Sequence, residues 1–452
     1  MFKLLTVSLG LLLLFGCASY GVIDNAPLTE STATDSTPSY SIKRHAQGRR
    51  GYGDDVGIVL AFSGGGTRAA ALAYGVLEEL RDTMVVIDGQ PRRLLDEVDF
   101  ISSVSGGSFT SAYYGLHGDG IFEDFKDKFL YQDIERKLVR GVLRPRVWLG
   151  TETRTEMAVK IYEKEVFHGA TFADMQREGA PLILINASDL GYGVRFSFVQ
   201  EYFDLLCSDI ASFPVARAVT ASSAVPLVFH PIVVKNYHDC KTTGKPDWMV
   251  AAAKRLAHDP DMAHVVRGLE TYYEKESRDY AHFVDGGITD NLGLRAVYEV
   301  VQLVGGAGAY FKSAGVKPPR YAAFITVNAS TDLETTIDKS HKQPSLAETI
   351  SAVSNIQIHR YNDATQVLTD RSLESWAELV STPDNPVMAY NVRVGFDDIE
   401  HPDDRSFFNR IPTSFSLSDE QVDRLIDASR ELLRNNPNYQ RLLADFGVVQ
   451  PL

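Results

Sequence analysis

The chain has 452 residues, 44% of them hydrophobic, and its 59 acidic residues outnumber the 45 basic ones to give a formal net charge of −14. An acidic chain of this kind is not expected to bind nucleic acid, or to adhere to anionic lipid by charge alone. Its length and apolar content suffice for one large α/β domain with helical additions, or for two domains.

The N-terminal region has the pattern of an export signal. Lys3 precedes an apolar run from Leu4 to Phe15, which is too short to span a bilayer as a stable helix. The run ends in Gly16 and Cys17, and a small residue directly before a cysteine resembles the bacterial lipobox. We therefore expect residues 1–16 to be a signal peptide. The alternative is an ordinary secretory signal followed by an incidental cysteine.

Lipidation of Cys17 would bind the protein to a membrane. Each of two or three acyl chains contributes about 0.8 kcal/mol per buried methylene, so the anchor is stable. Ala18 replaces the aspartate that favours inner-membrane retention, which points to the outer membrane, facing the periplasm. Residues 17–55 are rich in Ser, Thr, Pro, Gly and Asp and are expected to form a flexible tether. In an exported chain, Cys207 and Cys240 are candidates for a disulfide.

A glycine-rich loop lies between a predicted strand and a predicted helix. Residues 57–62 form a short apolar run typical of a buried strand, residues 63–68 read Ser-Gly-Gly-Gly-Thr-Arg, and a helical pattern covers residues 69–80. This order places unblocked backbone amides at a helix N-terminus, which suits an anion. The anion is either the oxyanion of an acyl transfer or a nucleotide phosphate, unless the loop is only a tight turn.

The nucleotide alternative depends on a second pattern in the same region. Gly64, Gly66 and Ala69 fit the dinucleotide fingerprint. Asp88 stands 22 residues past Gly66, after the apolar run 84–87, where a ribose-binding acid would lie. An oxyanion hole, in contrast, requires a nucleophile and a base elsewhere in the chain.

The candidate nucleophile is Ser105. Residues 98–104 form a second strand-like run that stops at Ser105, before a segment that can continue as a helix. Residues 103–107 match the elbow motif G-x-S-x-G with serine in place of the first glycine, and serine is small enough for the close packing that this strained turn requires. The alternative is that Ser105 only caps the helix.

The candidate base is Asp285. A catalytic serine needs a neighbour that accepts its proton. None of the eleven histidines lies in a glycine-rich turn after a late strand, and we expect structural or exposed positions for His230, His282, His341 and His359. Asp285 ends an apolar run and precedes two glycines, so its carboxylate can approach another backbone, and partial desolvation would raise its proton affinity. The alternative is an aspartate in a tight surface turn.

Taken together, the three motifs resemble those of the patatin-like phospholipase family in their order and approximate spacing. The match covers about residues 56–330 and includes similar blocks at residues 186–190 and 221–226. The resemblance implies a Ser-Asp dyad of Ser105 and Asp285, which hydrolyses phospholipid or lysophospholipid esters through an acyl-enzyme. It also implies an oxyanion hole formed by Gly64, Gly65, Gly66 and Gly106. Arg68 resembles the family's arginine near this loop, which implies that it binds an anion or the substrate.

The C-terminal third is expected to be mostly helical. Residues 321–327 are typical of a further buried strand, residues 346–380 have a helical pattern, and residues 418–421 resemble a capping box before an amphipathic helix. We predict a three-layer α/β/α domain at residues 56–330, with a central, mainly parallel sheet. A helical extension at residues 331–452 is expected to pack on it.

The sequence favours a lipid acyl hydrolase of the phospholipase A or lysophospholipase-like esterase type. No metal-ligand spacing stands out, so neither a metal nor a cofactor is expected, and no protein partner is predicted. Two alternatives stay open. One is a catalytically silent envelope protein that binds lipid or acts as a scaffold, and the other is a nucleotide-binding Rossmann-like protein.

Overall fold

The computed structural model describes residues 20–28, 40–48, 55–137, 153–226, 228–238, 245–332, 337–339 and 341–446. Cys207 is disulfide-bonded. Cys17 and Cys240 lie outside the described residues, so the lipidation of Cys17 and the pairing of Cys207 with Cys240 stay predictions. Among the described helices, none combines the length and the hydropathy needed to cross a membrane.

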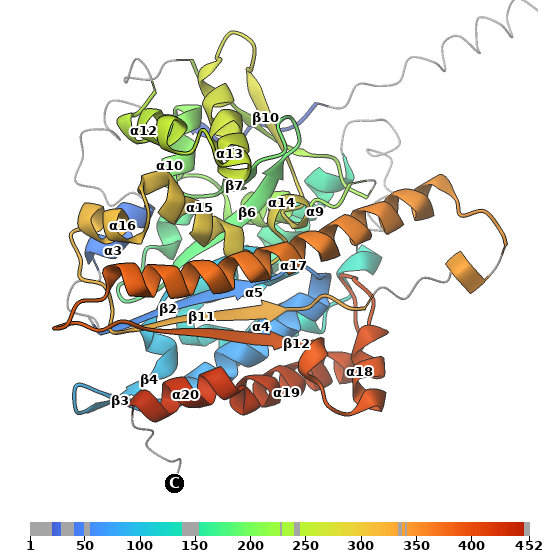
Figure 1. Ribbon diagram of the computed structural model, residues 1–452. Coiled ribbons are helices and arrows are strands. Elements are labelled where there is room, and N and C mark those ends of the chain that lie inside the picture. The colour runs from blue at the N-terminus through green and yellow to red at the C-terminus, as the bar shows by residue number, and fades with distance from the viewer. Residues whose placement is uncertain are drawn as a thin grey trace, which may run out of the picture.

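A mixed β-sheet of eight strands forms the centre of the described part of the chain (Figure 1). The strands are β2 (Val56–Phe62), β5 (Val98–Val104), β6 (Leu182–Asp189), β7 (Arg195–Ser197), β9 (Ile232–Lys235), β10 (Tyr280–Val284), β11 (Tyr321–Asn328) and β12 (Met388–Gly395). Their order is β12-β11-β2-β5-β6-β10-β9, with β7 paired to β6 outside this path. The first five strands of this order are parallel, whereas β10, β9 and β7 pair in the antiparallel sense.

Helices cover both faces of the sheet. One face contacts α4 (Gly66–Asp82), α5 (Gly106–His117), α11 (Val215–Ser222), α19 (Asp419–Asn435) and α20 (Pro437–Phe446). The other contacts α3 (Ile42–Gly48), α15 (Leu294–Val304), α16 (Ala307–Ala314) and α17 (Leu346–Val380). Further helices are α6 (Ile121–Phe125), α9 (Arg154–Tyr162), α10 (Gln200–Phe203), α12 (Asp247–Arg255), α13 (Pro260–Glu270), α14 (Gly287–Asp290) and α18 (Pro402–Asn409).

The predicted three-layer fold with a mainly parallel sheet and added C-terminal helices is confirmed. Every residue of β6 is buried, as expected for a central strand with helices on both faces, whereas burial alternates along the edge strand β12. The predicted boundary at residue 330 does not divide the structure, since β12 lies beyond it and pairs along its full length with β11. The C-terminal region therefore adds a strand to the sheet as well as helices.

Asp88 does not lie where a ribose-binding acid would be needed. The preceding strand, β3 (Met84–Ile87), pairs with β4 (Gln90–Arg93), and among the described strands these two form a separate two-stranded sheet. Asp88 and Gly89 form the turn between them, with φ values of 54° and 73°. Two positive φ values are typical of a tight hairpin turn, for which Asp-Gly is a preferred pair. The nucleotide-binding alternative is therefore left without the acidic residue that would bind the ribose.

Close packing of α4 against α19 attaches the C-terminal helices to the domain. A Cβ atom at Gly75 of α4 would lie 2.5 Å from the backbone carbonyl oxygen of Ile426, so only glycine permits this approach. One turn further along α4, the buried Glu79 carboxylate accepts bonds of 2.9 and 2.6 Å from Arg434. The predicted capping box at the start of α19 is confirmed, with Ser418 and Gln421 bonding to each other's backbone.

Substitution of Gly75 by alanine will separate the two helices. We expect Gly75→Ala to lower the free energy of unfolding by about 1–3 kcal/mol, since the Ile426 backbone as well as the Ser429 hydroxyl blocks the new methyl group. Gly308→Ala in α16 is the matched control, because nothing lies within 4 Å of its Cβ position, and it should be neutral or slightly stabilising. Urea unfolding measures both, and equal stability of the two variants would contradict the prediction.

Candidate active site

Three loops meet at the carboxyl ends of β2 and β5. These strands are parallel neighbours, with Phe62 opposite Ser103, so the loops that follow them start side by side. The third loop follows β10, whose last residues, Phe283 and Val284, pair in the antiparallel sense with the carboxyl end of β6. A Cβ atom at Gly286 would lie 2.4 Å from the Asn186 carbonyl oxygen and 3.0 Å from the Val104 side chain. The segment after β10 is thus packed against the residue that precedes Ser105.

Ser105 occupies a strained turn between β5 and α5. Its φ of 49° and ψ of −119° fall in a region that residues with a side chain rarely adopt. The turn persists because the neighbours leave no room for another path. A Cβ at Gly107 would lie 2.8 Å from the Phe62 Cβ, and one at Gly106 would lie 2.0 Å from the Gly66 carbonyl oxygen. Ser105 itself is 5% exposed.

The glycine loop after β2 is fixed by bonds to distant segments. The Ser63 amide donates to the Val327 carbonyl at 3.0 Å, and the Gly64 amide donates to the Asn291 carbonyl at 3.0 Å. The Gly64 amide therefore has a protein acceptor, which does not support its predicted place in an oxyanion hole. The described residues supply no hydrogen-bond acceptor for the amides of Gly65, Gly66 and Gly106.

These three amides lie at the first turns of two helices. Gly66 begins α4 and Gly106 begins α5, and the contact between their backbones holds the two N-termini together. The macrodipole of each helix places partial positive charge at this end. A Cβ at Gly64 would lie 3.3 Å from the Ser105 Cβ, so the glycine loop also borders the serine. The geometry suits a small anionic oxygen next to Ser105.

Asp285 lies directly after β10, and its carboxylate is near enough to the Ser105 hydroxyl to interact with it. Its own amide donates to the Ala224 carbonyl at 3.0 Å, and its carboxylate accepts from the Gly287 amide at 2.7 Å. Only 9% of Asp285 is exposed. Burial raises its pKa to about 6, although the Gly287 amide and the Ser105 hydroxyl both stabilise the charged form. The structure thus brings the two predicted reacting groups together.

Ser222, at the end of α11, connects the serine turn with the aspartate loop. Its hydroxyl accepts from the Ser105 amide at 2.8 Å and donates to the Asn186 carbonyl at 2.6 Å. Its backbone carbonyl accepts from the Gly286 amide at 3.0 Å. The resemblance had included residues 221–226 without assigning a role to them. The structure gives Ser222 a positioning role, which no local pattern reveals because its partners are distant in sequence.

Arg68 holds the glycine loop to the C-terminal region. Its guanidinium donates to the carbonyls of Ala329, at 2.8 Å, and Ile411, and to the Thr413 hydroxyl at 3.0 Å. Burial lowers its pKa to about 10. The contacts are all with oxygens of the protein, so they do not support the predicted role in binding an anion. Arg68 instead secures the start of α4, beside the Thr67 amide, which donates to Ser414 at 2.8 Å.

Asn291 is a further residue of the site that the sequence did not indicate. Besides its carbonyl contact with Gly64, its Oδ1 would lie 2.7 Å from a Cβ at Gly64 and 3.1 Å from one at Gly287. Its amide nitrogen donates weakly, at 3.4 Å, to Ser330. Asn291 therefore spans the glycine loop and the aspartate loop. Of the histidines considered, His230 and His282 are exposed, and within the described residues no group of His, Cys, Asp or Glu could hold a metal ion.

Comparisons with known proteins identify one family. The family model described as "Patatin-like phospholipase" matches residues 60–298, whereas no curated protein matches the chain. Human GIVD cytosolic phospholipase A2 is similar in structure, with 11% identity, a TM-score of 0.43 and coverage of 95% of this chain. This chain spans 66% of that protein's length. VipD from Legionella pneumophila has 12% identity and a TM-score of 0.26, with 83% of this chain and 67% of that chain covered.

The buried carboxylate makes folding stability depend on pH. Between pH 4 and 6 the folded protein binds more protons at Asp285 than the unfolded chain does, so Asp285 makes stability fall as pH rises through this range. We expect Asp285→Asn to be more stable than the parent above pH 7, by up to about 3 kcal/mol. The difference should shrink toward pH 4. Urea unfolding measures it, with the exposed Asp384→Asn as control, and a constant difference would contradict the prediction.

Proposed function

Because the chain belongs to the patatin-like phospholipase family, we propose that it is a lipid acyl hydrolase with Ser105 as nucleophile and Asp285 as base. The observation that carries this proposal is that the Asp285 carboxylate lies near enough to the Ser105 hydroxyl to be stabilised by it, in a position where burial raises the Asp285 pKa to about 6. At neutral pH such a carboxylate is mostly ionised, yet it is a stronger base than an exposed aspartate. It can therefore accept the serine proton without a histidine.

The first half-reaction forms an acyl-enzyme. The Ser105 oxygen attacks the ester carbonyl carbon while its proton passes to Asp285, and the carbonyl oxygen becomes an oxyanion. The amides of Gly65, Gly66 and Gly106 would donate to it, and each such donor is typically worth about 2.7–4 kcal/mol in the transition state. The C–O bond to the alcohol then breaks, and the leaving oxygen takes the proton from Asp285.

The second half-reaction releases the acyl group. Water attacks the acyl-enzyme carbonyl while Asp285 accepts a proton from it, and the same amides face the new oxyanion. The bond to the Ser105 oxygen breaks, Ser105 regains the proton, and a fatty acid leaves. Phospholipids or lysophospholipids are the substrates that we propose from the family, with no metal in either step.

Removal of the nucleophile tests the assignment. Ser105→Ala should lose covalent labelling by an alkyl fluorophosphonate and lower kcat for a soluble acyl ester by about 10⁴-fold or more. Ser111→Ala is the matched control, because Ser111 is buried in α5, the helix that follows Ser105, and its hydroxyl donates to Ser103. Labelling that survives in folded Ser105→Ala protein would exclude Ser105. An unlabelled, folded parent would favour the lipid-binding scaffold.

The pH dependence of hydrolysis tests the base. Protonation of Asp285 removes the acceptor, so kcat should fall about tenfold per pH unit below 6 and should be constant above about pH 7. Initial rates on a soluble ester measure this, with the fraction of folded protein determined at each pH. A constant kcat between pH 4.5 and 7.5 would show that Asp285 is not the base.

We also propose that Cys17 carries the membrane anchor and that the enzyme faces the periplasm from the outer membrane. The support is the sequence pattern alone. Cys17→Ser should move the protein from the outer-membrane fraction to the soluble periplasmic fraction, without changing kcat on a soluble ester. Membrane fractionation and immunoblotting measure the change, and retention of the variant in the membrane fraction would contradict the proposed anchor.

A further inference from the structure

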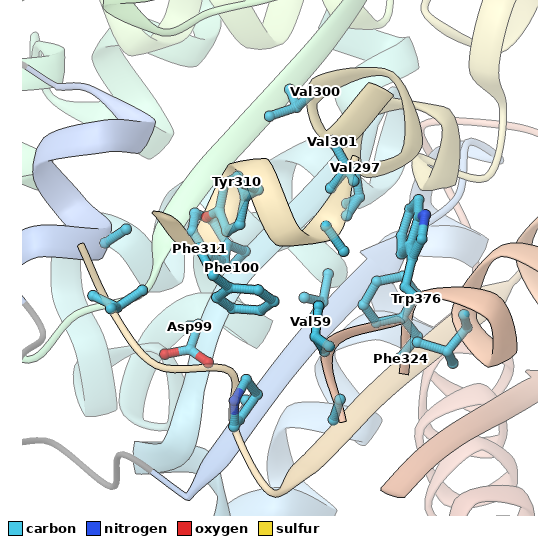
Figure 2. Close-up of a pocket in the computed structure, with 18 of the residues that line it drawn as sticks. Val59, Asp99, Phe100, Val297, Val300, Val301, Tyr310, Phe311, Phe324 and Trp376 are labelled. Carbon is cyan, nitrogen blue, oxygen red and sulfur yellow. The ribbon is translucent and has the colours of Figure 1, made fainter. Parts of the chain in front are cut away.

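A cavity of about 220 Å³ lies between the sheet and the helices α3, α15, α16 and α17 (Figure 2). It is bordered by the first halves of β2, β5 and β11, whereas Ser105 follows the opposite end of β5, and neither Ser105 nor Asp285 lines the cavity. Its walls are mainly apolar. The larger side chains on them include Val59, Phe100, Val297, Phe311, Phe324 and Trp376.

The partial exposure of residues on β2 and β5 shows that the helices do not pack directly against this part of the sheet. On β2, Ile58 and Leu60 point to one face and are fully buried, whereas Val59 points to the other face and is only half-buried. On β5, Ile101 is fully buried and the neighbouring Phe100 is half-buried. Both strands lie in the middle of a sheet with helices on both faces, where such exposure is unusual.

One end of the cavity is polar. His45 and Asp99 line it there, joined by a bond of 2.9 Å between the His45 Nε2 and the Asp99 carbonyl oxygen. The Asp99 carboxylate accepts from the Ile58 amide at 3.1 Å. Lys317 also lines the cavity and is exposed, so its ammonium group can meet a ligand at the rim. The cavity thus combines an apolar interior with a cation where it opens.

We propose that this cavity binds a free fatty acid, with the acyl chain inside and the carboxylate at Lys317. The volume exceeds the roughly 150 Å³ that holds a benzene ring in an apolar protein cavity, and it is below the roughly 300 Å³ at which drug-sized pockets begin. A cavity of this size suits an acyl chain of medium length. The inference does not depend on the proposed hydrolase activity, because it uses none of the reacting groups.

Intrinsic fluorescence provides a direct test, because Trp376 lies in the wall (Figure 2). The chain has three tryptophans, at positions 148, 248 and 376. A terminally brominated octanoic acid should quench part of the emission of the full-length protein. Trp376→Phe should abolish this quenching while calorimetry still detects binding, and Trp248→Phe should retain it. Quenching that persists in Trp376→Phe would overturn the proposal.

Chain length and charge distinguish a fatty acid from other occupants. Affinity should rise about fourfold per methylene from six to nine carbons and then level off. Lys317→Met should weaken octanoate binding about two- to fivefold and leave octanol binding unchanged. Affinity that is independent of chain length, or tighter binding of an equal-length lysophosphatidylcholine, would overturn the assignment. So would absent binding of all these acids, as expected if another segment of the chain occupies the cavity.

A variant that fills the cavity completes the test. Ala322 of β11 lines the cavity, and Ala322→Phe would occupy the space of about three methylenes, so octanoate affinity should fall about 60-fold. Circular dichroism and urea unfolding check the folding of Ala322→Phe. If this variant does not fold, the effect of Lys317→Met on octanoate affinity takes its place as the test. Ser105→Ala should bind octanoate as the parent does. Loss of hydrolysis with intact binding, or the reverse, therefore separates this proposal from the proposed function.

Discussion

The backbone contact between Gly66 and Gly106 is the constraint on which the site depends. It brings the first turns of α4 and α5 together, so that free amides from both helices face the same volume beside Ser105. Any side chain at Gly106 would collide with backbone, which cannot rotate away as a side chain can. The strained conformation of Ser105 follows from this contact, because the chain must leave β5 and begin α5 within a single residue.

The Asp285 carboxylate reaches the site because the sheet contains antiparallel as well as parallel strands. The parallel strands β2 and β5 supply the glycine loop and the serine, whereas Asp285 comes from the antiparallel β10 and approaches from the far side of β6. Loops packed from both directions leave little room for water, and the resulting burial raises the pKa of Asp285. Ser222 bonds to both sides, so the distance between serine and aspartate depends on one hydroxyl group and one carbonyl.

Much of the fold and the main site residues could be predicted because their signals are local. Apolar runs that end in glycine identified the three strands and the loops after them, and the strand predicted at residues 57–62 is Val56–Phe62. Ser222, Asn291 and the contacts of Arg68 could not be predicted, since small polar residues are common and their partners are more than 100 residues away in most cases. For the same reason, the bond from the Gly64 amide to the Asn291 carbonyl could not be predicted.

The C-terminal strands have a consequence for the boundaries of the folding unit. The family match ends at residue 298, but β11 and β12 continue the sheet from β2, and Ser414 accepts a bond from the first turn of α4. A fragment cut at residue 298 would expose β2 as an edge strand with unpaired backbone groups along seven apolar residues. Such an edge favours strand pairing between molecules and aggregation. The smallest fragment that stays soluble is therefore longer than the segment matched by the family model.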